Sequence, residues 1–244
     1  WGYNAYGQLG QGNTNNFGGN AGAVPADAGD VNLGDAGAIQ LVAGVNHTCA
    51  VLSNGKVRCW GIGSYGQLGY GNTNNFGDDP GEIPADAGDV NIDDGGVAQI
   101  SLGQEHTCAL LANGKVRCWG AAGAGALGYG NGTSVTVPAT AGDVNVGGDV
   151  IQIATGRHHT CAILSNGKLR CCGYGAMGAL GYGNTGVFGD SAGEVPADAG
   201  YVDVGGDVIR IAAGGYSTCA LLANRKVRCW GYNRRGQLGY GNTI

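Results

Sequence analysis

Short apolar runs alternate along the chain with stretches rich in glycine, asparagine and aspartate. The clearest example surrounds Ser53-Asn54-Gly55, where the apolar segments Cys49–Leu52 and Val57–Cys59 lie symmetrically on either side. Glycine at the last position of a three-residue loop can adopt the left-handed backbone conformation that closes a hairpin. The pattern therefore predicts a β-hairpin. Its expected cross-strand pairs are Cys49–Cys59, Ala50–Arg58, Val51–Val57 and Leu52–Lys56.

This hairpin belongs to an internal repeat. The segment HTCAVLSNGKVRCWG begins at His47, and close copies begin at His106, His159 and Ser217. With Trp1, Trp60, Trp119, Cys172 and Trp230 as one register, the spacings are 59, 59, 53 and 58 residues. We expect a single propeller-type domain over 1–244. Its predicted units are repeats 1–59, 60–118, 119–171 and 172–229 and a partial repeat 230–244.

Each repeat is expected to supply four strands. A further apolar run precedes each hairpin, at residues 39–42, 97–100, 150–153 and 208–211, and the fourth strand is expected near Trp60 or at 90–92. Both faces of the hairpin are apolar, which is typical of sheets covered on both sides. No segment shows the 3.6-residue apolar period of a helix. Four strands in 50–60 residues indicate a propeller blade, so the expected fold is all-β with about four blades.

Composition excludes several classes of protein. Glycine supplies 52 of the 244 residues without the three-residue period of collagen, and 43% of the residues are hydrophobic, which argues against disorder. The net charge of -5 argues against a nucleic-acid partner, which needs clustered Lys and Arg. No apolar run has the length of a membrane span. The chain has no P-loop, G-x-S-x-G or H-E-x-x-H motif, so we expect no cofactor and no enzymatic activity.

One repeat reads Ala43-Gly44-Val45-Asn46-His47-Thr48, then Cys59-Trp60-Gly61, then Gly66-Gln67-Leu68-Gly69. This pattern resembles the repeat of the regulator of chromosome condensation (RCC1) family, above all the cysteine-containing repeats of bacterial secreted or surface proteins. The resemblance covers the whole chain. It implies a seven-bladed β-propeller scaffold, whose known uses include guanine-nucleotide exchange, chromatin binding and, in a bacterial relative, inhibition of β-lactamase.

Four repeats are too few for seven blades. In addition, residues 230–243 duplicate residues 1–14 with only Arg234, Arg235 and Tyr240 differing. We therefore expect RCC1-like blades in a partial or truncated propeller, with a closed ring of four as the alternative.

Eight of the nine cysteines form pairs ten residues apart within the hairpins. Cysteines that face each other on antiparallel strands can meet disulfide geometry, so we expect one bridge per hairpin. Buried free thiols are the alternative, and the C-x9-C spacing disfavours zinc. Bridges imply an oxidising compartment, so the expected localisation is extracellular or cell surface. Cys172, which replaces the repeat tryptophan, is expected to be a buried free thiol. The expected pairs are Cys49–Cys59, Cys108–Cys118, Cys161–Cys171 and Cys219–Cys229.

Two other groups of residues are candidates for chemistry. Histidine precedes the first cysteine in three repeats, at His47, His106 and His159, and we expect each ring to bond the backbone of a neighbouring loop rather than to bind a metal. Asp78, Asp79 and Glu82 form the densest acidic cluster, a candidate loop for a basic partner or Ca²⁺. The hairpin Lys and Arg and the connector Asp and Glu are expected on different surfaces of the disc.

The leading functional hypothesis is a non-catalytic binding or surface-display propeller with an unknown protein partner, no nucleic acid and no membrane span. A structural assembly module that self-associates through open blade ends is the first alternative. A guanine-nucleotide exchange or chromatin-binding factor is the second, and the cysteine spacing and acidic balance disfavour it.

Overall fold

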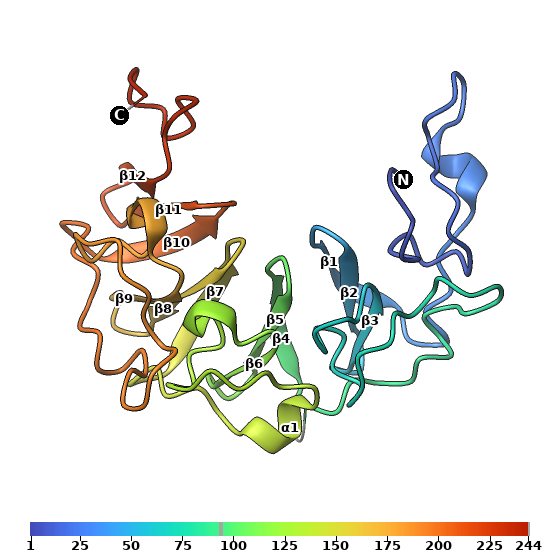
Figure 1. Ribbon diagram of the computed structural model, residues 1–244, viewed down its shortest axis with the longest axis horizontal. Coiled ribbons are helices and arrows are strands. Elements are labelled where there is room, and N and C mark those ends of the chain that lie inside the picture. Colours follow the sequence, from blue (N-terminus) through green and yellow to red (C-terminus); the bar gives the residue numbers. More distant parts are fainter. Residues whose placement is uncertain (93–94, 244) are drawn as a thin grey trace.

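Four antiparallel sheets of three strands follow one another along an open arc, with the two ends of the chain on either side of the opening (Figure 1). The structure is a computed structural model that describes residues 1–92 and 95–243, so residue 244 of the predicted partial repeat lies outside the described residues. The all-β prediction of about four blades in a partial propeller is confirmed. Blade 1 comprises β1 (Ala38–Ala43), β2 (His47–Leu52) and β3 (Val57–Gly61), and blade 2 comprises β4 (Val97–Leu102), β5 (His106–Leu111) and β6 (Val116–Gly120). Blade 3 comprises β7 (Val150–Thr155), β8 (His159–Leu164) and β9 (Leu169–Gly173). Blade 4 comprises β10 (Val208–Ala213), β11 (Ser217–Leu222) and β12 (Val227–Gly231).

Within residues 1–92 and 95–243, helical structure is confined to short turns. They are α1 (Pro138–Ala141) and the 3-10 turns Pro25–Ala28, Gly123–Gly125 and Ala176–Gly178. Among the described residues no helix has the length and apolar character needed to cross a membrane.

The predicted hairpin and its register are confirmed. In blade 1 the strands β2 and β3 pair Cys49 with Cys59, Ala50 with Arg58 and Val51 with Val57. The strand before each hairpin pairs with its first arm, which gives the order β1-β2-β3 in blade 1. The loop closes because Gly55 adopts a φ of 77°, the left-handed conformation that the sequence predicted.

Arg225 occupies this same left-handed position in blade 4, with a φ of 67°. A side chain there costs on the order of 1 kcal/mol, which glycine avoids. We expect Arg225→Gly to raise the free energy of unfolding by about 0.5–1 kcal/mol, measured by urea denaturation. Ala223→Gly in the same loop is the matched control, and it should stabilise nothing because the φ of Ala223 is not left-handed. A loss of stability in Arg225→Gly would contradict the strain argument.

The prediction of a fourth strand is wrong for the described residues. The free edge of β3 instead forms separate hydrogen bonds with three different residues of the following segment. At one end Val90 N donates to Val57 O at 2.9 Å, and at the other Gly61 forms an isolated bridge with Phe76. Between them the Tyr70 hydroxyl accepts from Cys59 N and donates to Cys59 O, both at 3.0 Å. A glycine- and asparagine-rich segment thus satisfies the edge without running beside it as a strand.

This tyrosine cap recurs in every blade. Its other copies are Tyr129 on Cys118, Tyr182 on Cys171 and Tyr240 on Cys229. Burial raises the pKa of Tyr70 to about 12, so the hydroxyl keeps the proton that it donates. The Gly-Tyr-Gly motifs at residues 69–71, 128–130, 181–183 and 239–241 therefore have a structural role, which the sequence interpretation did not recognise.

Neighbouring blades pack through two complementary apolar faces. The outgoing face of blade 1, which points to blade 2, consists of Cys49, Val51, Val57 and Cys59. The incoming face of blade 2 receives it with Ile100, Leu102, Ala109, Leu111 and the connector residues Val90 and Ile92. Equivalent clusters join blade 2 to blade 3 and blade 3 to blade 4. The hydrophobic core is therefore a series of junctions between blades rather than one central cluster.

Two polar links cross each junction between described blades. The Gln40 side chain donates through Nε2 to Ile100 O at 3.2 Å and accepts from Ile100 N at 2.8 Å. Gln99 and Gln152 repeat this contact with Ile153 and Ile211. The amide thus acts as an extra backbone unit between inner strands.

The second link is a histidine–threonine bond. His47 Nε2 lies 3.0 Å from Thr107 Oγ1, and the Thr107 hydroxyl itself donates to Gln67 O at 2.9 Å. The threonine proton is therefore in use, so His47 donates from Nε2. The prediction that the ring bonds the backbone of a neighbouring loop is wrong, because the ring bonds the threonine hydroxyl of the next blade instead. The other copies are His106–Thr160 and His159–Thr218.

Candidate protein-binding face

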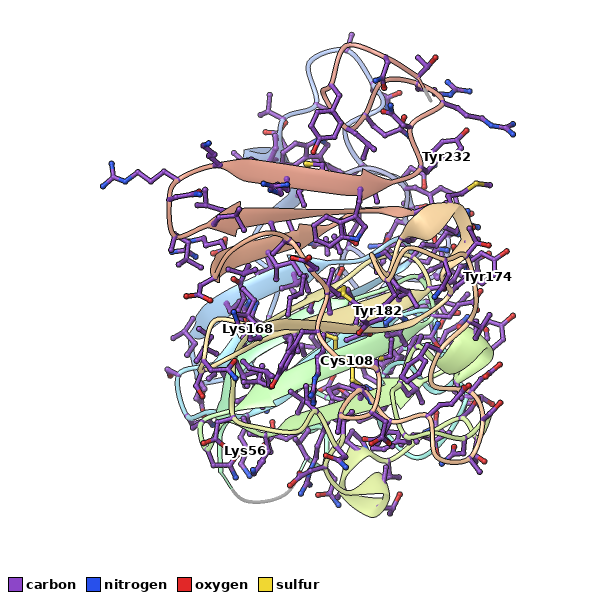
Figure 2. The ribbon with its side chains drawn as sticks, turned by 90° about the vertical axis from the view of Figure 1, so that its left-hand side faces the viewer. Lys56, Cys108, Lys168, Tyr174, Tyr182 and Tyr232 are labelled. Atoms are coloured by element: carbon purple, nitrogen blue, oxygen red, sulfur yellow. A yellow bond between two sulfur atoms is a disulfide. The ribbon has the colours of Figure 1, made fainter. Side chains whose placement is uncertain are left out.

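The hairpin side of the disc carries charges that neutralise one another. Figure 2 shows Lys56 and Lys168 on this side, opposite Tyr174 and Tyr232. Each of four hairpin cations is paired with an aspartate of the following connector, at 2.9–3.3 Å. The expectation that acids and bases lie on different surfaces is therefore wrong, because each connector passes beside the preceding hairpin. The pairs are Arg58–Asp89, Arg117–Asp143, Lys115–Asp149 and Lys168–Asp207.

The opposite side is formed by two loops from each blade. One joins the inner strand to the hairpin, and the other follows the last strand. A backbone bond ties them together, as from Tyr174 N to His158 O at 2.8 Å in blade 3. The first residue position of this pair is Asn46, Glu105, His158 or Tyr216, and the second is Ile62, Ala121, Tyr174 or Tyr232. The scaffold is therefore constant, whereas the side chains it presents differ from blade to blade.

Aromatic side chains gather where blades 3 and 4 meet, and we call His158, Tyr174 and Tyr216 with the neighbouring Tyr232 the tyrosine face. The ring centroids of His158, Tyr174 and Tyr216 lie 6.2–6.5 Å from one another. The guanidinium of Arg157 lies 5.6 Å from the Tyr216 ring centroid, within cation–π range. Tyr and Arg are the residue types enriched at the energetic centres of protein interfaces.

Burial is the main cause that lowers the pKa of His158, with a further lowering from Arg157 and an opposing effect of Glu105. The imidazole is therefore mostly neutral at pH 7, and the aromatic cluster carries no second positive charge beside Arg157.

A pocket of about 400 Å³ opens beside this cluster. It is lined by Glu105, Ala121, His158, Tyr174 and Tyr216, among others, and so combines aromatic walls with one carboxylate. A second pocket of about 440 Å³ lies where the inner loops of all four blades converge. Both are large enough for side chains of a bound protein segment.

The turns at this face also hold backbone strain. Ala124 and Met177 have φ values of 56° and 61°, and both stand at the position of Tyr65 in the second repeat. In that repeat the Gln67 side chain accepts from Tyr65 N at 2.9 Å, whereas alanine stands at residues 126 and 179. Left-handed non-glycine residues are uncommon, and they occur at functional loops as well as in tight turns.

The predicted site residues lie elsewhere, in the junctions and on the rim. The eight paired cysteines are bonded within their hairpins as Cys49–Cys59, Cys108–Cys118, Cys161–Cys171 and Cys219–Cys229. Cys172 is a buried free cysteine, and burial raises the pKa of its thiol to about 12. It is therefore poorly reactive, because the thiolate is the nucleophile.

The carboxylates of the acidic loop around Asp78, Asp79 and Glu82 form hydrogen bonds within the loop. Glu82 accepts from Gly77 N at 2.9 Å, and Asp78 accepts from the Asn75 side chain at 2.8 Å. Across the described residues no three His, Cys, Asp or Glu side chains lie close enough together to hold a metal ion. The structure thus uses two of these carboxylates to shape the loop.

The sequence analysis did not identify His158 or the tyrosines of this face as candidate binding residues. The available signal was the comparison of repeats, since residues 46, 105, 158 and 216 differ in every copy, whereas the residue two positions later is always threonine. Variable positions on a constant scaffold are where a repeat protein carries specificity.

Comparison with known sequences gives a consistent family match. The regulator of chromosome condensation (RCC1) repeat matches residues 38–67, 97–125, 150–179 and 208–237, and a second profile with that description matches 1–51, 54–110 and 113–163. The ultraviolet-B receptor UVR8 of Arabidopsis thaliana is 30% identical over 100% of this chain and 51% of its own length. The probable E3 ubiquitin-protein ligase HERC6 of Homo sapiens is 32% identical over 84% of this chain and 19% of its own.

Solved structures show the same fold. Prp20p of Saccharomyces cerevisiae aligns with a TM-score of 0.65 and 23% identity over 90% of this chain and 50% of its own. Human WBSCR16 aligns with a TM-score of 0.64 and 24% identity over 80% and 47%. The chain spans about half the length of UVR8 and of both structures.

Proposed function

This chain belongs to the regulator of chromosome condensation (RCC1) repeat family, and from that membership we propose that it is a non-catalytic module that binds a protein partner through the tyrosine face. The observation that carries the proposal is the clustering of His158, Tyr174 and Tyr216 at one position of an otherwise regular scaffold. The hairpin side is a weaker candidate, because four of its cations are already paired with aspartates of the chain.

Relatives support a binding role. Prp20p, which is yeast RCC1, has described binding properties to Gsp1p and histones and is known in complex with Kap60. A propeller of this family generally serves as a binding scaffold. In this chain His47, His106 and His159 are each 1% exposed and engaged in a junction, so they are poorly placed to act on a substrate.

The module is further proposed to work in an oxidising compartment, extracellular or at a cell surface. Four intrahairpin disulfides support this placement, because such bonds persist where the glutathione pool does not reduce them. The thiol state of the protein taken from its native source tests the placement.

Site-specific cross-linking tests the binding proposal. A photoreactive residue at Met177, which is exposed beside the cluster, is expected to capture a defined partner from the native cell surface. Tyr174→Ala with Tyr216→Ala should reduce that capture at least tenfold, because truncating two aromatic anchors removes about 1–2 kcal/mol each. The control is the same photoreactive residue at Ser165, on the exposed hairpin loop of the opposite side. Equal capture from both positions would place the contact elsewhere.

A further inference from the structure

Glu105, beside the tyrosine face, departs from the charge pattern of the repeats. It is the only Asp or Glu in the segments 38–61, 97–120, 150–173 and 208–231, which span the four three-stranded sheets. The aligned positions of the other repeats hold Asn46, His158 and Tyr216. This carboxylate is therefore an addition at one place on the loop side of the disc, and it is not part of the recurring ion pairs of the hairpin side.

The pocket of about 400 Å³ beside Glu105 opens where a small residue stands among aromatic rings. Ala121 of blade 2 occupies the position that Tyr174 has in blade 3, and both line the pocket. Among the described lining residues Glu105 alone is charged near pH 7, because burial lowers the pKa of His106 to about 3 and also lowers that of His158. The pocket thus combines aromatic walls with a single negative charge.

The Glu105 carboxylate has unused capacity to accept hydrogen bonds. Within the described residues its side chain accepts one bond, from Gln104 Nε2 at 3.2 Å, and forms no ion pair. An ionised carboxylate offers about four acceptor sites. Arg157, the cation nearby in the sequence of blade 3, lines the pocket at the inner loops and not this one. A cation from outside the chain can therefore reach the carboxylate and neutralise it.

Tyrosine rings of this chain already bind cations. The Arg157 guanidinium lies 5.6 Å from the ring centroid of Tyr216, and that of Arg170 lies 4.6 Å from the ring centroid of Tyr201. Both distances are within cation–π range. Tyr174 is 38% exposed and has no such cation among the described residues. Its ring is therefore available to a cation that enters the pocket.

Backbone bonds between blades fix the positions of the side chains around the pocket. Gln104 N donates to Arg157 O at 3.0 Å across the junction of blades 2 and 3, and Arg157 N donates to Gly215 O at 3.0 Å across the next junction. Each of these three residues directly precedes a residue that lines the pocket. The pocket is thus held in shape before a ligand binds, which lowers the entropic cost of binding.

We propose that this pocket receives a lysine or arginine side chain of the protein partner. The ammonium or guanidinium group donates to the Glu105 carboxylate, and the aliphatic stem packs against Tyr174 and Ala121. The inference rests on the proposed function, because it names the chemistry that the tyrosine face recognises in its partner. Glu105 selects the charge of the side chain, and the aromatic rings supply the contact area.

NMR titration with short peptides tests the inference without the partner. The capped tripeptides Gly-Lys-Gly and Gly-Arg-Gly are expected to shift the backbone signals of residues 105, 121, 158 and 174, with dissociation constants in the millimolar range. The capped Gly-norleucine-Gly peptide keeps the apolar stem without the charge and should bind about fivefold more weakly. Gly-Glu-Gly should not bind, because its carboxylate is repelled by Glu105.

Two variants test the residues that carry the inference. Glu105→Gln removes the charge with little change of shape and should weaken binding of the lysine peptide about fivefold, and Tyr174→Leu should weaken it about threefold. The matched controls are Asp35→Asn, which removes an exposed carboxylate elsewhere, and Tyr65→Leu, which replaces an exposed tyrosine after blade 1. Both controls should leave the affinity unchanged.

Equal affinity for the lysine and norleucine peptides, or no shift with about 20 mM lysine peptide, would overturn the inference. Photocross-linking from residue 177 separates this failure from a failure of the proposed function. Capture that depends on Tyr174 and Tyr216 but survives Glu105→Lys would refute the basic side chain and leave the binding face in place. Capture that does not depend on either tyrosine would contradict the proposed function, and the inference with it.

Discussion

Between pH 6.5 and about 4 the free energy of unfolding is expected to fall steeply, by up to about 4 kcal/mol per pH unit. Burial lowers the pKa of His47 and His159 to about 4 and that of His106 to about 3. In the unfolded chain these three histidines take up protons near pH 6.5. In the folded protein they take up protons only near their lowered pKa values of about 4 and 3. Stability is therefore complete above pH 6.5 and is lost as the pH falls toward 4.

The groups around His106, whose pKa is the lowest of the three, reinforce this trend. His159, His47 and His158 lower the pKa of His106 further once they carry charge. Protonation also leaves a second N–H donor at Nδ1, and His47 Nδ1 and His159 Nδ1 have no hydrogen-bond partner in the described structure. Acid should therefore act on the junctions between blades.

Urea denaturation at several pH values measures the effect. His106→Gln retains an amide donor toward Thr160 but does not titrate, so it should reduce the pH slope by about one-third. Tyr6→Phe, at a residue remote from the junction histidines in sequence, is a control that should leave the slope unchanged. A wild-type stability that is flat between pH 6.5 and 4 would show that the histidines accept protons without opening the junctions.

Replacing Cys108 and Cys118 together by alanine is expected to lower the free energy of unfolding by about 3 kcal/mol or more. Opening the loop that they close restores conformational entropy to the unfolded chain, about 2–3 kcal/mol for this loop length. Both side chains are also buried in the junction between blades 2 and 3, so truncation removes packing as well.

The last hairpin supplies the comparison. Cys219 and Cys229 are bonded in the same way but are only half-buried, so their replacement should cost the entropic part with less loss of packing. Peptide mapping without reductant comes first and should recover all four linked pairs with Cys172 unlinked. Complete alkylation of the native protein without reductant, or two variants within 0.5 kcal/mol of wild type, would contradict the role assigned to the bridges.

The hairpins were predictable because their contacts are local. Cys49 and Cys59 are ten residues apart, and four copies of one pattern fix both the turn and the register. The inner strand was predictable for the same reason, as an apolar run of the right length before each hairpin. The blade edge was not, because the Tyr70 hydroxyl and isolated backbone contacts from Val90 and Phe76 replace the strand that a propeller blade usually has there.

The contacts between blades could not be predicted from the sequence of one repeat. Thr107 lies 60 residues from His47, and the distance along the chain exceeds the period of the pattern. Within its own repeat, Thr107 looks like any strand residue, so the pairing could be inferred only once the blades were stacked. The candidate face escaped notice for a related reason. His158 and Tyr216 are neighbours in space but belong to different repeats.

The position of the bridges within single hairpins has a further consequence for how the disulfides form during folding. Eight cysteines allow 105 pairings, but each partner here is ten residues away inside a hairpin that forms by local contacts. Short-range closure is the fastest kind, so the productive pairing has a kinetic lead over every mispairing. No disulfide joins one hairpin to another. A gene could therefore gain or lose a whole repeat by duplication or deletion without leaving a cysteine unpaired. The covalent bonds thus make each unit self-contained, whereas cohesion of the array is left to non-covalent contacts.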